Sequence, residues 1–101
     1  MEYVRIAKYS IDKGTFQEIA DVAKTGLLRK FQEQPGFIRY GLADMGENTC
    51  VSMSFWTTRE DALAAETVAK TWTRETLGDK VILKSSYIGS LAFLEGVMVT
   101  V

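Results

Sequence analysis

The sequence predicts an α+β fold in which two helices lie on one face of an antiparallel sheet. Two segments carry apolar residues at intervals of three and four, which is the spacing of an amphipathic helix. Each segment follows a Thr that has an acidic residue three positions further on, the pattern of a capping box. Four other segments are strand-like, and short turn sequences separate them.

The chain is expected to begin with a strand, because the side chains of residues 3–10, YVRIAKYS, alternate in type. Successive side chains of a strand point to opposite faces of the sheet. One predicted face therefore carries Val4, Ile6 and Lys8, and the other carries Tyr3, Arg5, Ala7 and Tyr9.

A long helix is expected to follow, beginning after Thr15, which pairs with Glu18 as a capping box. Its apolar stripe continues past Gly26 to Phe31. A Gly in a helix interior costs about 1 kcal/mol relative to Ala, which close packing against a neighbour would offset. We predict one continuous helix here, ended by the Pro-Gly turn at residues 35–36.

Two strands and a second helix come next. Residues 37–45 and 49–57 are both strand-like, and the turn MGEN around Gly46 joins them as an antiparallel hairpin. In the segment TTRED, the first Thr with the Glu, or the second Thr with the Asp, forms a capping box for the second helix. The Gly-Asp pair at residues 78–79 is expected to end this helix.

The rest of the chain is expected to supply a fourth strand over residues 80–95, with Gly89 as its candidate bulge. Residues 97–101, VMVTV, are expected to add a further strand. The order strand, helix, strand, strand, helix, strand is that of the ferredoxin-like sandwich. At this length we predict a single domain over residues 1–101.

Neither face of the predicted sheet is polar enough to meet water. Two helices cover only one face of a sheet, so the other face needs a separate cover. We expect a second copy of the chain to pack there, which predicts a homodimer with the form of a dimeric α+β barrel. In the third strand, one uncharged row is Val51, Met53 and Phe55, and the other is Cys50, Ser52, Ser54 and Trp56.

The composition excludes several classes of partner and site. With 12 basic and 13 acidic residues and a net charge of −1, the chain has no electrostatic footprint for nucleic acid or an anionic membrane. A single Cys50, a charged beginning and no apolar stretch long enough to span a bilayer predict a cytoplasmic protein. Because the chain has no His, the usual zinc ligand sets and a Ser-His-Asp triad are missing, and we expect neither a metal nor another cofactor.

Three short motifs stand out along the chain. They are PGF followed by a Tyr at residues 35–40, the pattern W-x-[S/T]-x-E-x-A at residues 56–62, and YIG at residues 87–89. Together they resemble the antibiotic biosynthesis monooxygenase superfamily of dimeric α+β barrels. The resemblance implies a pocket between helices and sheet, lined by aromatic and a few polar groups.

The resemblance also implies a type of chemistry. The oxygenases of this superfamily use no metal or flavin: an electron-rich phenol or anthrone is deprotonated, and its carbanion reacts directly with O₂. The quinone-forming members rely on Asn, Trp, Tyr and Arg, and the haem-degrading members on His, Asn and Trp. This chain has no His, and its one Asn, Asn48, lies in the predicted hairpin, so only Trp, Tyr and Arg candidates remain.

No catalytic residue is assigned from the sequence, and each candidate for a ligand site has a structural alternative. Arg39 would hold an anion or stabilise an enolate, or else form a surface or dimer salt bridge. Trp72 either packs in the core or points its N–H into a cavity. The full candidate set is Trp56, Trp72, Tyr40, Arg39, Ser54 and Tyr87.

Two functions are consistent with these patterns. The first is a cofactor-independent monooxygenase that acts on a small aromatic or polyketide-like molecule. The alternative is a non-catalytic dimeric α+β barrel that binds a small apolar ligand or serves as a structural dimer. The face of the sheet on which Trp56 lies bears directly on this choice, because only the helix-covered face offers a closed pocket.

Overall fold

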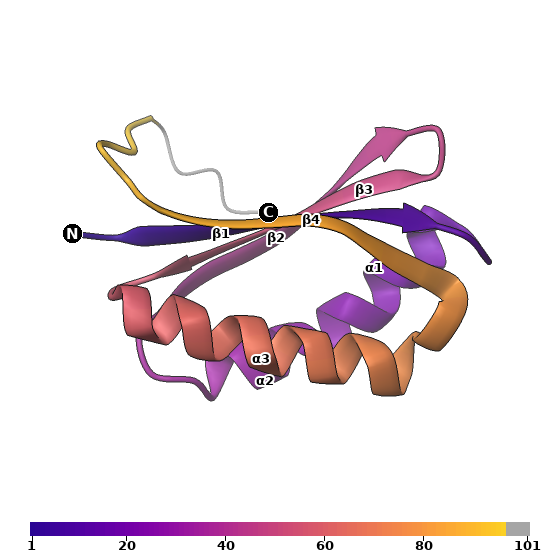
Figure 1. Cartoon of the computed structure of the whole chain (residues 1–101), viewed down its shortest axis with the longest axis horizontal. Helices are drawn as coiled ribbons and strands as arrows, with labels where there is room; N and C mark the ends of the chain where they lie inside the picture. Colours follow the sequence, from indigo (N-terminus) through magenta and orange to yellow (C-terminus); the bar gives the residue numbers. More distant parts are fainter. Residues whose placement is uncertain (97–101) are drawn as a thin grey trace.

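The computed structural model describes residues 1–96 and has two layers, a four-stranded sheet and a layer of helices on one of its faces (Figure 1). The predicted α+β class is confirmed, and most of the predicted elements are present. The strands are β1 (Tyr3–Ile11), β2 (Phe37–Gly46), β3 (Thr49–Trp56) and β4 (Val81–Ser90). The helices are α1 (Phe16–Thr25), α2 (Leu27–Gln32) and α3 (Arg59–Thr76), and the 3-10 turn η1 (Gly78–Lys80) follows α3.

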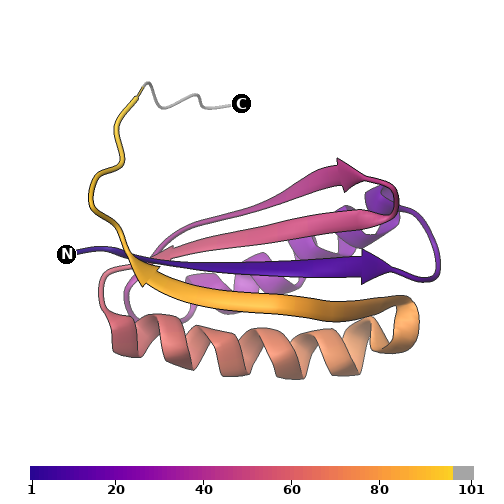
Figure 2. The ribbon, with the colours of Figure 1, turned by 45° about the horizontal axis from the view of Figure 1, so that its top comes forward.

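The strands lie in the order β2-β3-β1-β4, and every neighbouring pair is antiparallel. This is the strand order of the ferredoxin-like sandwich predicted from the sequence. Figure 2 shows the four strands side by side, with α3 running along the sheet below β4. The two edge strands, β2 and β4, therefore each have one side without a neighbouring strand within residues 1–96.

The prediction of one continuous first helix is wrong, because the helix breaks at Gly26 into α1 and α2. The indole of Trp72 on α3 lies so close to Gly26 that a Cβ there would be 2.9 Å from two ring atoms. Gly26 keeps a backbone hydrogen bond to Val22, and the chain changes direction around the ring. The predicted N-cap is present: the Thr15 hydroxyl accepts a hydrogen bond from the Glu18 amide at 3.2 Å.

The second predicted helix is present as α3. Of the two capping boxes considered, the one with Thr58 and Asp61 is present. The Thr58 hydroxyl accepts a hydrogen bond of 3.1 Å from the Asp61 amide. The Thr57 hydroxyl instead donates to the Asp61 carboxylate at 3.2 Å.

In the hairpin between β2 and β3, Glu47 and Asn48 both have positive φ, as a tight turn that matches the twist of a hairpin requires.

The fourth strand is shorter than predicted, because β4 ends at Ser90 rather than at residue 95. Its irregularity is also misplaced in the prediction: the register against β1 shifts between Lys8 and Tyr9, opposite Lys84, and not at Gly89. The shift moves Ile82 onto the same face as Tyr87. The further strand predicted for residues 97–101 lies outside the described residues.

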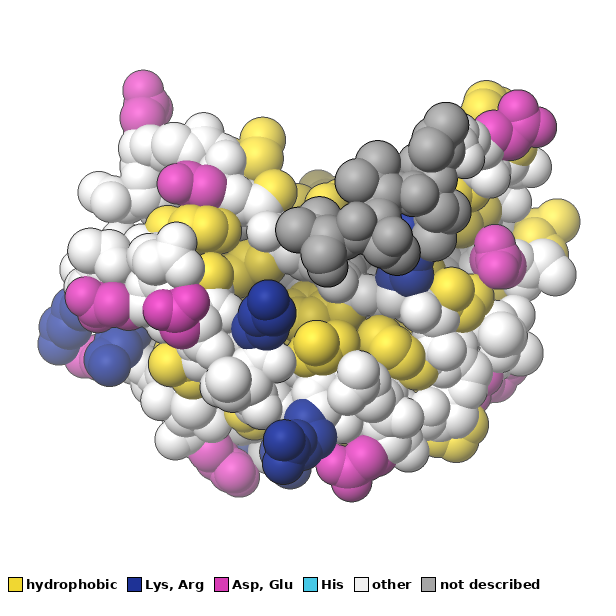
Figure 3. All heavy atoms as spheres, turned by 180° about the vertical axis from the view of Figure 1, so that it is seen from behind, with side chains coloured by type: hydrophobic (Ala, Val, Ile, Leu, Met, Phe, Trp, Pro, Cys, Tyr) yellow, Lys and Arg dark blue, Asp and Glu magenta, His cyan; other side chains and the backbone are white. Residues whose placement is uncertain are grey.

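The two sheet faces differ as the alternation of β1 and β3 predicts. In β3, Cys50, Ser52, Ser54 and Trp56 are buried beneath the helices, and the residues between them are only partly buried. The face away from the helices, called the open face below, carries many hydrophobic side chains. Figure 3 shows hydrophobic side chains in the upper part of the molecule, where this face lies. The open face includes Val4, Ile6, Val51, Met53, Phe55 and Tyr87.

Candidate functional site

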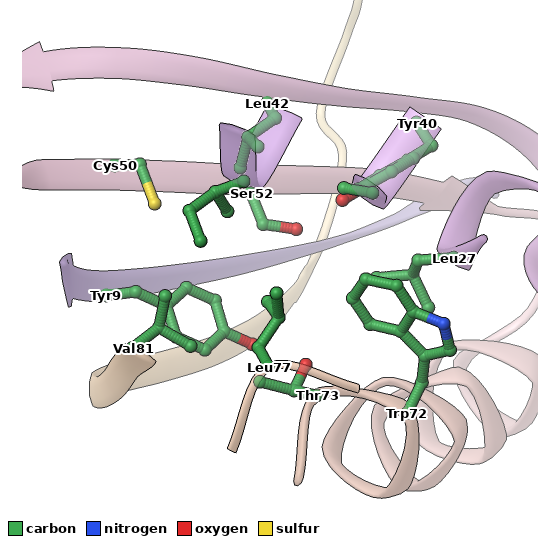
Figure 4. Close-up of a pocket in the computed structure, with 12 residues that line it drawn as sticks. Tyr9, Leu27, Tyr40, Leu42, Cys50, Ser52, Trp72, Thr73, Leu77 and Val81 are labelled. Carbon is green, nitrogen blue, oxygen red and sulfur yellow. The ribbon is translucent and has the colours of Figure 1, made fainter. Parts of the chain in front are cut away.

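A small cavity lies between the helices and the sheet (Figure 4). Its volume is about 20 Å³, which is room for about one water molecule. Side chains therefore fill most of the space in which the sequence predicted a pocket. The lining residues are Tyr9, Ile19, Ala23, Leu27, Tyr40, Leu42, Cys50, Ser52, Trp72, Thr73, Leu77 and Val81.

The cavity is placed by the register of the sheet and by the apolar stripes of the helices. Ser52 lies between Leu42 on β2 and Ala7 on β1, so its small side chain leaves space in the middle of the sheet. Ile19 and Ala23 of α1 cover this space with their apolar stripe. The floor is thus partly polar and the roof is apolar, as in most small-molecule sites.

Among the residues that line the cavity, Tyr40 has the clearest shift of pKa. Burial raises the pKa of its hydroxyl to about 12, although a hydrogen bond with Ser52 and the charge of Arg5 act in the opposite direction. Its ring meets Phe31 edge-on, with ring centroids 5.1 Å apart. Tyr40 therefore stays protonated at neutral pH, so its hydroxyl serves as a hydrogen-bond donor or acid rather than as a base.

Trp72 forms a wall between the cavity and the outer surface. The same side chain lines the cavity and a surface groove of about 290 Å³ between α2 and α3. Gly26 gives the indole room, because any larger residue at that position would meet the ring. Trp72 is the residue that the linings of the cavity and the groove have in common.

Trp56 lies on the helix-covered face, which settles the orientation left open by the sequence, but it does not line the cavity. Its indole N–H donates a hydrogen bond of 2.9 Å to the Ser54 hydroxyl, and both side chains are fully buried. Phe31 and Phe37 pack against the ring with centroids 5.2 and 5.5 Å away. Trp56 and Ser54 thus belong to the packed core beside the cavity.

A buried cation lies under α3. The guanidinium of Arg5 is 1% exposed, and its Nε is 3.6 Å from the carboxylate of Glu66. The same carboxylate accepts a hydrogen bond of 2.8 Å from Ser86 and lies 3.7 Å from the ammonium of Lys70. These partners, led by the Ser86 hydroxyl, lower the pKa of Glu66. Nε and Nη2 of Arg5 have no hydrogen-bond partner within residues 1–96.

Arg39 and Tyr87 are not brought to the cavity. Arg39 pairs with Phe55 in the register, and Tyr87 pairs with Ile6, so both lie on the open face. The Tyr87 side chain is 67% exposed. Of the six residues singled out from the sequence, the structure brings only Tyr40 and Trp72 together around the cavity.

Sequence reasoning missed several lining residues. Cys50 is buried, this burial raises the pKa of its thiol, and its side chain contacts the cavity. Thr73 was not considered as a site residue. Tyr9 shares a row of β1 with Arg5 and Ala7, and the structure places this row beneath the helices, whereas Thr73 reaches the cavity because α3 crosses the sheet there.

Within the described part of the chain, no group of three or more Asp, Glu, Cys or His side chains is placed so that it could hold a metal ion. A helix long and apolar enough to cross a membrane is likewise missing from residues 1–96.

Comparison with protein families gives a match to the model described as antibiotic biosynthesis monooxygenase over residues 2–68, about two-thirds of the chain. The chain belongs to this family. The antibiotic biosynthesis monooxygenase resemblance seen in the three sequence motifs is thereby confirmed. A comparison with curated proteins gave no significant match.

Solved structures share the fold of this family member. A putative antibiotic biosynthesis monooxygenase from Nitrosomonas europaea is 24% identical, with a TM-score of 0.70 and coverage of 94% of each chain. SnoaB, a cofactor-independent oxygenase from Streptomyces nogalater, is 18% identical, with a TM-score of 0.68 over 92% of this chain and 95% of that one. MupZ from Pseudomonas fluorescens is 10% identical, with a TM-score of 0.71 over 86% and 69%. At these identities the similarity establishes the fold.

Proposed function

We propose that this protein is a cofactor-independent monooxygenase, an oxidoreductase that acts on a small aromatic or polyketide-like molecule between its helices and its sheet. The observation that carries the proposal is the protonated, partly buried Tyr40 hydroxyl, which lines the mainly apolar cavity together with Ser52 and Trp72 in a chain of this family. A donor in such a place strengthens as negative charge develops on a substrate oxygen.

The reaction proposed for an anthrone-like substrate needs no added reductant. Loss of a ring-methylene proton gives an enolate, whose oxygen accepts a hydrogen bond from Tyr40. The carbanion form then transfers electrons to O₂; one oxygen atom becomes the new carbonyl, and the other leaves as water with the two methylene hydrogens. No carboxylate lines the cavity, so the contribution of the lining residues is to stabilise the enolate rather than to remove the proton.

Substrate entry requires movement of side chains, because the cavity holds about one water molecule. Two surface hollows of about 220 Å³ each share lining residues with it. The hollow beside β2 shares Ala23, Tyr40 and Leu42, and the hollow beside β4 shares Tyr9, Thr73 and Val81. A change of rotamer at one of these walls would join a hollow to the cavity and give space for an aromatic ring.

We also propose that the protein works as a homodimer in the cytoplasm. The support for the dimer is the open face, where Ile6 and Met53 lie side by side among other apolar residues and no helix within residues 1–96 covers them. A continuous apolar face of this kind is rare on a monomer. Its cover by the same face of a second chain would be an isologous contact.

The alternative function is a non-catalytic dimeric barrel that binds a small apolar ligand or has only a structural role. The small size of the cavity and the absence of an acidic or imidazole base among its lining residues favour this alternative. It shares the fold and the dimer with the proposed enzyme and differs only in chemistry.

Oxygen uptake separates the two functions. With a panel of anthrone- and quinol-like compounds, the enzyme consumes O₂, and Tyr40→Phe slows the reaction about tenfold to a thousandfold, the effect of one donor to a developing oxyanion. Tyr3→Phe, which removes the same atom from a tyrosine that lines neither the cavity nor the hollow beside β4, is the matched control. Oxygen uptake indistinguishable from that of buffer across the whole panel would refute the proposed monooxygenase activity.

A further inference from the structure

The hollow beside β4, called the basic hollow below, differs in charge from the other depressions of the surface. It lies where the C-terminal part of α3 and η1 meet β4, and its volume is about 220 Å³. Lys70 and Arg74 line it, and no acidic residue does. By contrast, the groove between α2 and α3 has Lys30 opposed by two glutamates, and the hollow beside β2 has a single Lys24.

The two cations of the basic hollow are not neutralised to the same extent. Lys70 has a partner, because its ammonium lies 3.7 Å from the carboxylate of Glu66. Arg74 makes no hydrogen bond or ion pair with the described residues. The nearby acid on η1, Asp79, is already bound to Lys13 at 2.8 Å. The hollow therefore keeps an excess of positive charge at the C-terminal end of α3.

The inner side of the basic hollow is apolar and aromatic. Val81 is buried, Leu83 is 36% exposed, and the buried ring of Tyr9 forms the base. Tyr9, Thr73 and Val81 also line the cavity, so the hollow and the cavity are separated only by these side chains. In Figure 4 the Tyr9 hydroxyl points toward α3, where Thr73 and Leu77 lie.

We infer that the basic hollow binds an aromatic carboxylate, with its ring against Tyr9 and Val81 and its carboxylate at Arg74 and Lys70. The inference rests on the proposed function for the occupant being a small aromatic molecule, and it adds that this molecule carries a negative charge. A guanidinium is suited to this role because its fork of N–H groups matches the two oxygens of a carboxylate. The ring end of the molecule then faces the cavity that contains Tyr40.

A pair of probes that differ only in charge tests the inference. 2-Naphthoate and 2-naphthamide have the same ring system, and calorimetric titration of the full-length protein gives the affinity of each. The expected result is that 2-naphthoate binds up to about fivefold more tightly at low ionic strength, the effect of one well-placed surface ion pair. The ratio of the two affinities should decrease as salt is added, because the cations lie at the surface.

Arg74→Gln is the decisive variant, since it removes the unpaired cation and leaves the Glu66–Lys70 contact in place. It should bring the affinity ratio close to one, whereas Lys24→Gln, at the hollow beside β2, should leave the ratio unchanged. Amide chemical shifts should respond to 2-naphthoate at Tyr9, Thr73 and Val81. Equal binding of the two probes, or an unchanged ratio in Arg74→Gln, would overturn the inference.

The inference and the proposed function fail in different ways. Oxygen uptake with anthrone-like compounds, together with equal affinities for the two naphthalene probes, would keep the monooxygenase and remove the carboxylate site. Tighter binding of 2-naphthoate that depends on Arg74, without oxygen uptake on neutral or carboxylated anthrones, would keep the site and remove the reaction.

Discussion

The indole of Trp72 on α3 lies against the backbone of Gly26, the residue at which α1 and α2 are separated. A Cβ at Gly26 would be 2.9 Å from Cζ2 and Nε1 of this ring, closer than side chains pack. Since Trp72 also lines the cavity, the residue that permits the break in the helix also sets the position of one cavity wall.

Gly26→Ala should therefore destabilise the protein, although Ala is the better helix former by about 1 kcal/mol. Overpacking of this kind costs about 1–3 kcal/mol, which leaves a net loss of up to about 2 kcal/mol. Urea unfolding followed by circular dichroism measures the difference. Gly41→Ala is the control, because a Cβ at Gly41 meets nothing within 4 Å. A gain in stability for Gly26→Ala would contradict the described contact.

The hydroxyl of Tyr40 should ionise at a higher pH in the folded protein than in the unfolded chain. Its ordinary pKa is 10.0, and burial raises it to about 12 in the folded protein. Absorbance near the phenolate band, recorded as pH rises, should show a late step that is absent in Tyr40→Phe. The unfolded chain releases this proton first, so the protein should lose stability as pH rises above about 10. A titration curve of the folded protein that lacks this late step would argue against the raised pKa of Tyr40.

The two partners of the Arg5–Glu66 contact should respond differently to substitution. Glu66→Gln leaves a guanidinium buried without its carboxylate, and should cost about 1–3 kcal/mol, the penalty of an unsatisfied buried polar group. Arg5→Met removes the buried charge and keeps most of the apolar stem, and should change stability by about 1 kcal/mol or less. Chemical denaturation measures both. Equal losses in the two variants would show that the contact is not governed by burial of the charge.

Acid should weaken the protein partly through Glu66. Its pKa is lowered in the folded state from an ordinary value of 4.5, chiefly by the hydrogen bond from Ser86 and then by Lys70 and Arg5. The stability it contributes is therefore complete above about pH 4.5 and is lost as pH falls through the lower, folded pKa. Glu66→Gln should flatten the decrease of unfolding free energy below that pH. If the unfolding free energy of Glu66→Gln decreases as steeply in acid as that of the unsubstituted protein, other carboxylates are responsible for the decrease.

The proposed dimer should depend on the open face. Met53→Glu introduces a charge into the middle of this apolar face, and light scattering at micromolar concentration should then give the mass of one chain. Leu63→Glu makes the same kind of change on α3, where Leu63 is already 43% exposed, and should leave the dimer intact. A single-chain mass for the unsubstituted protein would refute the dimer.

Much of the fold could be predicted because it depends on local patterns. Alternation in β1 and β3 sorts the side chains into two rows, and Thr15 and Thr58 mark the helix starts through hydrogen bonds made within three residues. The break at Gly26 was not predictable in this way, because it depends on Trp72, which is distant in the sequence. The bulge opposite Lys84 depends likewise on the register with β1, which no local pattern of β4 contains.

The candidate site was harder to predict than the fold. Aromatic residues were selected by type, and type does not distinguish Tyr40, which lines the cavity, from Tyr87, which lies on the open face. Strand parity groups Trp56 with Ser52 and Ser54 but does not say which face the helices cover, and on the covered face core packing and cavity lining occur side by side. Residues that line the cavity can be told from residues of the packed core only when the position of α3 across the sheet is known. That position is a property of the whole tertiary structure.

The irregularity at the start of β2 has a consequence for how this protein can vary. Arg39 and Tyr40 are adjacent in the chain, but one lies on the open face and the other lines the cavity. Inserting or deleting one residue before Arg39 would exchange these two environments, placing a cation in the interior and a phenol at the surface. Homologous sequences should therefore tolerate length changes at the β2–β3 hairpin tip more readily than within β2 just before Arg39.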